Sequence, residues 1–172
     1  RSREACLLSS TLGMELAKKY NTRFHILHIT TQEEARMFDA GPIKNKRITS
    51  EACAHHLYFS DQDYITLGNQ IKCNPAIKTE ADRDAIIQAV LDDRIDIIAS
   101  DHAPHTWEEK GEVYKNAASG LPLVQHTLQI MLTHWKEGRI SLERIIEKMC
   151  HAPAECFNIV GRGYLEEGYF AD

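Results

Sequence analysis

The sequence predicts an α/β protein with a parallel sheet. Short strand candidates alternate with helical segments, as expected for β-α-β units. Two of these candidates, RFHILHI and IDIIAS, are almost continuously apolar, which is typical of strands buried on both faces. Neither GxGxxG nor GxxxxGK is present, so no phosphate-binding loop supports a nucleotide-binding version of this fold. The three expected strands are residues 23–29, 47–53 and 95–100.

The expected helices follow from apolar spacing and from end signals. Leu8, Leu12 and Leu16 recur at helical spacing in the first helix, and the pair Thr31 and Glu34 forms a capping box for the second. Residues 55–76 show no clear period, and the polar residues 106–120 predict a loop. The expected helices are residues 4–20, 31–40, 79–93, 121–137 and 141–150, with a short one after residue 153.

Length and charge limit the classes of protein that the chain can represent. The 172 residues suffice for one domain with its own core. The formal net charge of −5 does not favour nucleic acid or an anionic membrane surface as a partner. A closed (β/α)8 barrel usually needs about 250 residues. The sequence therefore predicts either a piece of such a barrel or a small, open, doubly wound domain.

The five cysteines predict a reducing environment. Their number is odd and no CxxC pair occurs, which argues against a disulfide framework and against a cysteine-type zinc site. We therefore interpret them as small buried apolar residues of a cytoplasmic protein.

The most informative segment is SDHAPH, residues 100–105, directly after the third expected strand. Functional groups of parallel α/β folds gather where strands end and loops begin. The Asp101 carboxylate beside His102 and His105 can bind a divalent metal ion or transfer a proton. The alternative is that Asp101 caps a turn and the two histidines lie on the surface.

Two histidines lie in the first expected strand. His25 and His28 are three residues apart, so the alternation of a strand places them on opposite faces and prevents both from pointing at one metal ion. His28 lies nearer the carboxyl end of the strand, and we expect it to be the ligand. His25 is expected to pack in the core or to support His28, and a hydrogen-bonded core imidazole is the alternative for either residue.

Two further segments carry polar groups. His55 and His56 are adjacent, so at most one can face a site, and we interpret both as supporting or structural residues rather than ligands. Asn74 precedes Pro75, which holds a donor and an acceptor in a restricted backbone conformation. Taken alone, Asn74-Pro75 indicates only a turn.

Four segments in this order resemble the motifs of dihydroorotases in the amidohydrolase superfamily. The segments are HILHITT, SEACAHHL, KCNPAIK and IIASDHAPH, against approximately LHIST, TPHHL, NPPLR and TDHAPH in the family. The polar loop and the turn that follows it, Ser119-Gly120-Leu121, also match. The chain departs at Ala54 and Ala76, where the family often has proline. Allantoinases and hydantoinases share the histidine-bearing strand and the aspartate, but differ after them.

The resemblance implies the C-terminal portion of a metal-dependent (β/α)8 TIM barrel. Residues 1–160 would belong to the barrel, and residues 161–172 would begin the exit toward a small β-domain. His28 would be a zinc ligand, and Asp101 would be both a zinc ligand and the general base. The positions that would contact dihydroorotate are Asn74, His105, Ser119 and Gly120.

The implied activity is a zinc-dependent, reversible interconversion of N-carbamoyl-L-aspartate and L-dihydroorotate in pyrimidine biosynthesis, with one or two zinc ions per site. Alternatives are an allantoinase, a hydantoinase, a dihydropyrimidinase or a non-catalytic scaffold subunit. The family's HxH zinc pair is absent here and is expected upstream of Arg1. We therefore expect this chain alone to bind zinc poorly and to be inactive. Expected partners are the small-molecule substrate and either a second copy or another pyrimidine-pathway enzyme, with no nucleic acid or membrane.

Overall fold

A three-stranded parallel sheet forms the centre of the molecule, in the order β1 (Phe24–Ile26), β2 (Ile48–Cys53) and β3 (Ile97–Ala99). The computed structural model describes residues 2–171. Arg1, which begins the predicted segment 1–160, and Asp172, which ends the predicted segment 161–172, lie outside the described residues. The α/β class and the parallel sheet are confirmed. Within the described residues the sheet is open and does not close into a barrel.

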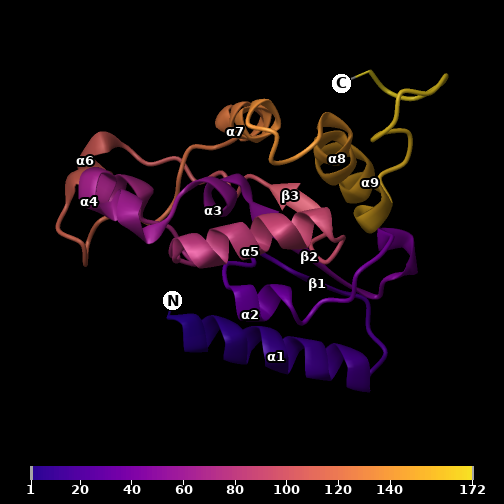
Figure 1. The fold of residues 1–172 in the computed structure, drawn as a ribbon, viewed down its shortest axis with the longest axis horizontal. Helices are drawn as coiled ribbons and strands as arrows, with labels where there is room; N and C mark the ends of the chain where they lie inside the picture. Colours follow the sequence, from indigo (N-terminus) through magenta and orange to yellow (C-terminus); the bar gives the residue numbers. More distant parts are fainter. Residues whose placement is uncertain (1, 172) are drawn as a thin grey trace.

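Helices lie on both sides of the strands. Helix α1 (Arg3–Lys19) runs along one side of the molecule, and α7 (His126–Lys136) and α8 (Leu142–Ile146) lie on the other, with the strands and α5 (Glu80–Leu91) between them (Figure 1). The short helix α2 (Gln32–Ala35) lies between α1 and α5. This layering gives the strands an apolar environment, as their composition predicts.

Local capping explains where the main helices begin. The Ser2 hydroxyl accepts a hydrogen bond from the Ala5 amide at the start of α1. Thr79 and Asp82 form a reciprocal capping box at the start of α5. Such caps stabilise a helix by about 1 kcal/mol each, because they pair amide groups that have no partner inside the helix.

The segment after β3 differs from the prediction in two places. The expected loop 106–120 contains α6 (Trp107–Gly111), because Thr106 and Glu109 form a capping box that the polar composition concealed. The helix expected from Leu121 begins instead at His126, the first residue of α7. Leu121 forms a parallel bridge with His102 and packs in a small core with Ile71 and Ile77, and this pairing keeps residues 121–125 out of the helix.

The segment without a clear period folds into short helices. They are α3 (Ala54–Tyr58), α4 (Tyr64–Leu67) and two 3-10 turns, Asp61–Asp63 and Gly68–Ile71. Another 3-10 turn, Ile43–Asn45, precedes β2.

The C-terminal helices are joined. Helix α8 continues through a π-helical segment, Glu147–His151, into α9 (Ala152–Phe157), where the sequence predicted two separate helices. Between residues 2 and 171, no helix has the length and apolar character needed to cross a bilayer.

The main core joins the sheet to α5. Ile86 and Val90 of α5 pack with Ile29, Ile98 and Met131, and each of these side chains is buried. Burying an aliphatic side chain of this size contributes about 1.5–3 kcal/mol. This core therefore packs α5 and α7 against the strands and fixes the positions of the strand ends.

We predict that Ile86→Ala destabilises the chain by about 2–5 kcal/mol, because it removes buried methyl groups and leaves a cavity. Ile86 is 1% exposed, whereas Ile65 of α4 is 81% exposed. The matched variant Ile65→Ala should change the free energy of unfolding by less than about 0.5 kcal/mol. Urea unfolding followed by circular dichroism measures both, and equal effects of the two variants would contradict the assigned core.

Candidate metal and substrate site

The carboxyl ends of the three strands bring polar side chains together. His28 follows β1, His55 follows β2 and Asp101 follows β3. His28 and Asp101 both adopt left-handed backbone conformations, with φ of 58° and 45°. Non-glycine residues rarely adopt this conformation, and it is concentrated at functional sites.

Glu51 of β2 holds both histidines of the first strand segment. Its Oε1 lies 2.8 Å from His28 Nδ1, and its Oε2 lies 3.1 Å from His25 Nε2. The expectation that His25 and His28 lie on opposite faces is therefore wrong. Strand β1 ends at Ile26, and the left-handed turn at His28 breaks the alternation on which the expectation rested. His25 Nδ1 also bonds to Thr49 Oγ1 at 2.8 Å, so His25 has the supporting contacts that we expected.

The charge of Glu51 orients His28. Burial raises the pKa of this carboxyl, but the hydrogen bonds from His25 and His28 outweigh burial and lower it to about 2. The ionised Glu51 carboxylate accepts a hydrogen bond from His28 Nδ1–H. This contact orients the ring so that Nε2 faces Asp101. His28 Nε2 lies 3.5 Å from Asp101 Oδ1. Two ligands of one tetrahedral zinc ion are separated by roughly 3.4 Å, so this spacing suits a shared metal ion.

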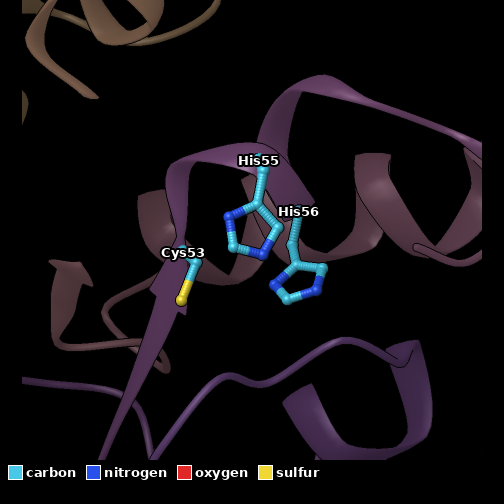
Figure 2. Close-up of side chains that lie close together, drawn as sticks. All are labelled: Cys53, His55 and His56. Atoms are coloured by element: carbon cyan, nitrogen blue, oxygen red, sulfur yellow. The ribbon is translucent and has the colours of Figure 1, made fainter. Parts of the chain in front are cut away.

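His55 is a further candidate donor from this chain. Figure 2 shows the Cys53 sulfur and the rings of His55 and His56 on the same side of the turn from β2 into α3. His55 is fully buried, and neither ring nitrogen has a hydrogen-bond partner within the described residues. His56, by contrast, bonds through Nε2 to the Pro75 carbonyl at 2.9 Å.

These contacts separate the two adjacent histidines. His55 shares its two unpaired, buried ring nitrogens with His134 of α7, whereas His56 has one unpaired nitrogen, Nδ1. Burial, and then the nearby charge of His28, lowers the pKa of His55 to about 3, so its ring is neutral, as a metal ligand must be. The structural role expected for His56 agrees with its bond to Pro75, and the ring of His55 packs against that of His56 with centroids 4.0 Å apart, which agrees with the same role. Sequence spacing could not choose between the two rings.

Cys53 lies between these groups. Its Sγ and donor atoms of His55 and His56 lie within 4.8 Å of one another, and Sγ is 3.1 Å from His28 Nδ1. Burial, and then the Glu51 charge, raises the pKa of the thiol. Cys53 is therefore protonated in the metal-free chain. Cys53 Sγ also lies within 4.8 Å of donor atoms of His28 and Glu51, and of the two ligands expected from the sequence, His28 approaches Asp101.

The loop after α6 assembles a second group. His105 Nε2 lies 3.2 Å from the Ser119 carbonyl oxygen, and the Gly120 amide donates to the Lys72 carbonyl at 2.9 Å. Gly120 has φ of 144°, and a Cβ there would lie 2.5 Å from the Ala103 Cβ. Only glycine fits this approach between the turn and the SDHAPH segment.

The remaining predicted residues take separate positions. Asn74 is exposed, is followed by a cis peptide bond to Pro75, and lies two residues after Lys72, which contacts the Gly120 turn. His102 Nδ1 accepts a hydrogen bond from the Val124 amide at 3.0 Å, which gives this histidine a structural role. The structure thus brings His28 close to Asp101. His105, Ser119 and Gly120 form a separate group, and Asn74 is connected to that group through Lys72.

Comparison with known sequences identifies the family. A sequence model described as "Amidohydrolase family" matches residues 14–172. The chain belongs to the amidohydrolase family. Curated dihydroorotases of Halalkalibacterium halodurans and Bacillus subtilis are each 37% identical to it over 158 residues. The match covers 91% of this amidohydrolase chain and 37% of each relative, so the chain spans little more than a third of their length.

Solved structures agree with this assignment. The L-hydantoinase (dihydropyrimidinase) of Arthrobacter aurescens superposes with a TM-score of 0.83 at 27% identity, covering 98% of this chain and 38% of that protein. The dihydroorotase of Saccharomyces cerevisiae superposes with a TM-score of 0.75 at 16% identity, covering 91% and 42%. At that identity the second likeness concerns the fold alone. Amidohydrolases are typically metal-dependent, which agrees with the donor atoms that converge here.

We predict that Glu51→Gln in the intact protein lowers metal affinity by roughly 10–100-fold, because the amide cannot hold His28 with the same charge-assisted hydrogen bond. Competition with a chelator measures the affinity. Glu112→Gln is the matched control at an exposed position and should leave the affinity unchanged. Equal affinities for Glu51→Gln and the unmodified protein would remove Glu51 from the support of the metal ligand.

Proposed function

We propose that this chain is the C-terminal portion of a (β/α)8 barrel, with residues 1–160 in the barrel and residues 161–172 leading toward a small β-domain. Support comes from the parallel sheet, whose outer strands β1 and β3 each have one neighbouring strand among the described residues. Leu8, Leu12 and Leu16 form an exposed apolar stripe on α1. Neighbouring barrel elements would pair with these strands and cover the stripe.

We further propose that the intact protein is a zinc-dependent dihydroorotase, which interconverts N-carbamoyl-L-aspartate and L-dihydroorotate in pyrimidine biosynthesis. The observation that carries this proposal is the approach of His28 Nε2 to Asp101 Oδ1, with His28 Nδ1 held by Glu51. The identity to curated dihydroorotases supports the choice of substrate. The five cysteines are free, which agrees with the reducing cytoplasm as its location.

The metal-binding residues of this chain would be His28 and Asp101, joined by ligands from the remainder of the protein. One or two zinc ions bound there would lower the pKa of water and polarise the amide carbonyl. In the hydrolytic direction, Asp101 takes the proton of the attacking water and passes it to the departing ring nitrogen. In the synthetic direction Asp101 performs the reverse transfer.

Recognition of the substrate falls to the second group. The Asn74 side-chain amide and the His105 imidazole offer hydrogen bonds to the ring and its carboxylate. The Ser119-Gly120 turn lies against His105 and would place its backbone beside the same carboxylate. Fixed donors orient the cyclic amide toward the general base, which lowers the entropic cost of reaching the transition state.

We predict that the intact protein hydrolyses L-dihydroorotate, that a chelator abolishes this turnover, and that Asp101→Asn lowers kcat by about 100-fold or more. The amide of asparagine cannot accept the proton. Absorbance of dihydroorotate follows the reaction. The matched control Asp39→Asn, at an exposed position, should retain normal turnover. Near-normal turnover by Asp101→Asn would exclude Asp101 as the base, and no turnover by a metal-loaded, unmodified protein would favour the scaffold alternative.

The second candidate is a hydantoinase or another cyclic amidohydrolase, and the similarity to the Arthrobacter aurescens L-hydantoinase is the observation in its favour. We predict that His105→Ala lowers kcat/KM for dihydroorotate by about tenfold or more, because a hydrogen bond to a carboxylate is lost. Turnover of dihydrouracil, which has no carboxylate, should change little. The control His126→Ala should affect neither substrate. Preferred turnover of hydantoin, allantoin or dihydrouracil by the unmodified protein would establish the second candidate.

A further inference from the structure

A buried lysine lies against the loop that contains the Ser119-Gly120 turn. Lys110 of α6 is only 8% exposed. Its ammonium group donates three hydrogen bonds to backbone carbonyls: to Lys72 at 2.9 Å, to Ala118 at 3.1 Å and to Gly120 at 2.9 Å. The accepting residues belong to two segments, one leading to Asn74 and the other containing the Ser119-Gly120 turn. One side chain therefore joins the two segments that carry the proposed substrate contacts.

Lys72 completes the connection. Its carbonyl accepts hydrogen bonds both from Lys110 Nζ and from the Gly120 amide. Its own ammonium group donates to the carbonyls of Tyr114 and Ala117. Two ammonium groups thus pair five carbonyl oxygens around a loop that has no regular secondary structure between residues 112 and 120.

This arrangement carries an energetic cost. No carboxylate forms an ion pair with Lys110 within the described part of the chain, so only carbonyl dipoles offset the loss of hydration. Burial accordingly lowers the pKa of Lys110. A buried cation without an anionic partner is unfavourable for stability alone. Its position beneath a loop beside the proposed carboxylate contact is consistent with a functional role.

The surroundings identify that role. A surface hollow lined by Gln70, His105, Trp107 and Gly120 opens directly beside the Lys110 side chain. Loss of the three carbonyl contacts would release the Ser119-Gly120 turn from the segment of Asn74. The positive charge would also be lost from the neighbourhood in which the anionic substrate is expected.

We propose that Lys110 is a positioning residue that holds the Ser119-Gly120 turn and the Asn74 segment in the geometry that receives an anionic cyclic substrate. This inference rests on the proposed function, because it concerns the same substrate site. Lys110 acts through the backbone and does not contact the reacting atoms. Its contribution therefore belongs to substrate binding more than to the chemical step.

The first test compares Lys110→Met with the unmodified intact protein. KM for dihydroorotate should rise about tenfold or more, because hydrogen bonds to a charged group are lost, while kcat changes by less than about threefold and metal content stays the same. Lys115→Met is the control, since Lys115 is an exposed lysine of the same loop. An unchanged KM in Lys110→Met, or an equal rise in Lys115→Met, overturns the proposal.

The second test measures hydrogen exchange of the peptide that spans residues 112–121. The amide of Gly120 should exchange about tenfold faster in Lys110→Met than in the unmodified protein or in Lys115→Met. If Lys110→Met does not fold, Lys110→Arg retains the charge but cannot reproduce the three-carbonyl geometry, and it should show the same rise in KM and in exchange. Unchanged exchange in the folded variant overturns the proposal.

The two tests separate failure of this inference from failure of the proposed function. If the unmodified protein hydrolyses another cyclic amide instead of dihydroorotate, the proposed substrate is wrong. The exchange measurement then still decides whether Lys110 holds the loop, and KM for the substrate that is hydrolysed replaces KM for dihydroorotate. A rise in both quantities supports the positioning role, whereas no change in either rejects it.

Discussion

The buried carboxylate of Glu51 is the interaction on which the site depends. It lies in the central strand β2 and accepts hydrogen bonds from His25 and His28, which belong to the neighbouring strand segment. Because both oxygen atoms are used, the ring of His28 has one orientation, with Nε2 toward Asp101. A metal ligand is useful only in a fixed orientation, and a carboxylate behind the imidazole supplies it. A residue of the sheet itself therefore orients His28 through a direct hydrogen bond.

The same arrangement explains the unusual backbone at the strand ends. His28 and Asp101 adopt left-handed conformations two residues after the ends of β1 and β3. The core formed by the sheet and α5 holds both ends in place and offsets this strain. The loop that follows Asp101 is held differently, by the ammonium groups of Lys72 and Lys110 on backbone carbonyls. The proposed metal ligands thus depend on packed strands, and the proposed substrate contacts depend on hydrogen bonds to a loop.

Short-range patterns predicted much of the fold and part of the site. Apolar segments and caps located the three strands and helices α1 and α5, because these signals act over a few residues. The start of α7 was misplaced because Leu121 pairs with His102, a contact between residues 19 positions apart. Strand alternation assigned His25 and His28 to opposite faces, and it failed because β1 ends before His28.

The sequence by itself determined the α/β class, the order of the motifs and the candidates His28 and Asp101, since each follows from residue type and spacing along the chain. Only the tertiary structure decided that Glu51 holds both histidines, that His56 bonds to Pro75 while both ring nitrogens of His55 lack a partner among the described residues, and that Lys110 joins two loop segments. These distinctions depend on the directions of side chains from different elements. Spacing along the chain carries no information about such directions once a strand ends, because the backbone that follows is set by packing and hydrogen bonds with distant residues.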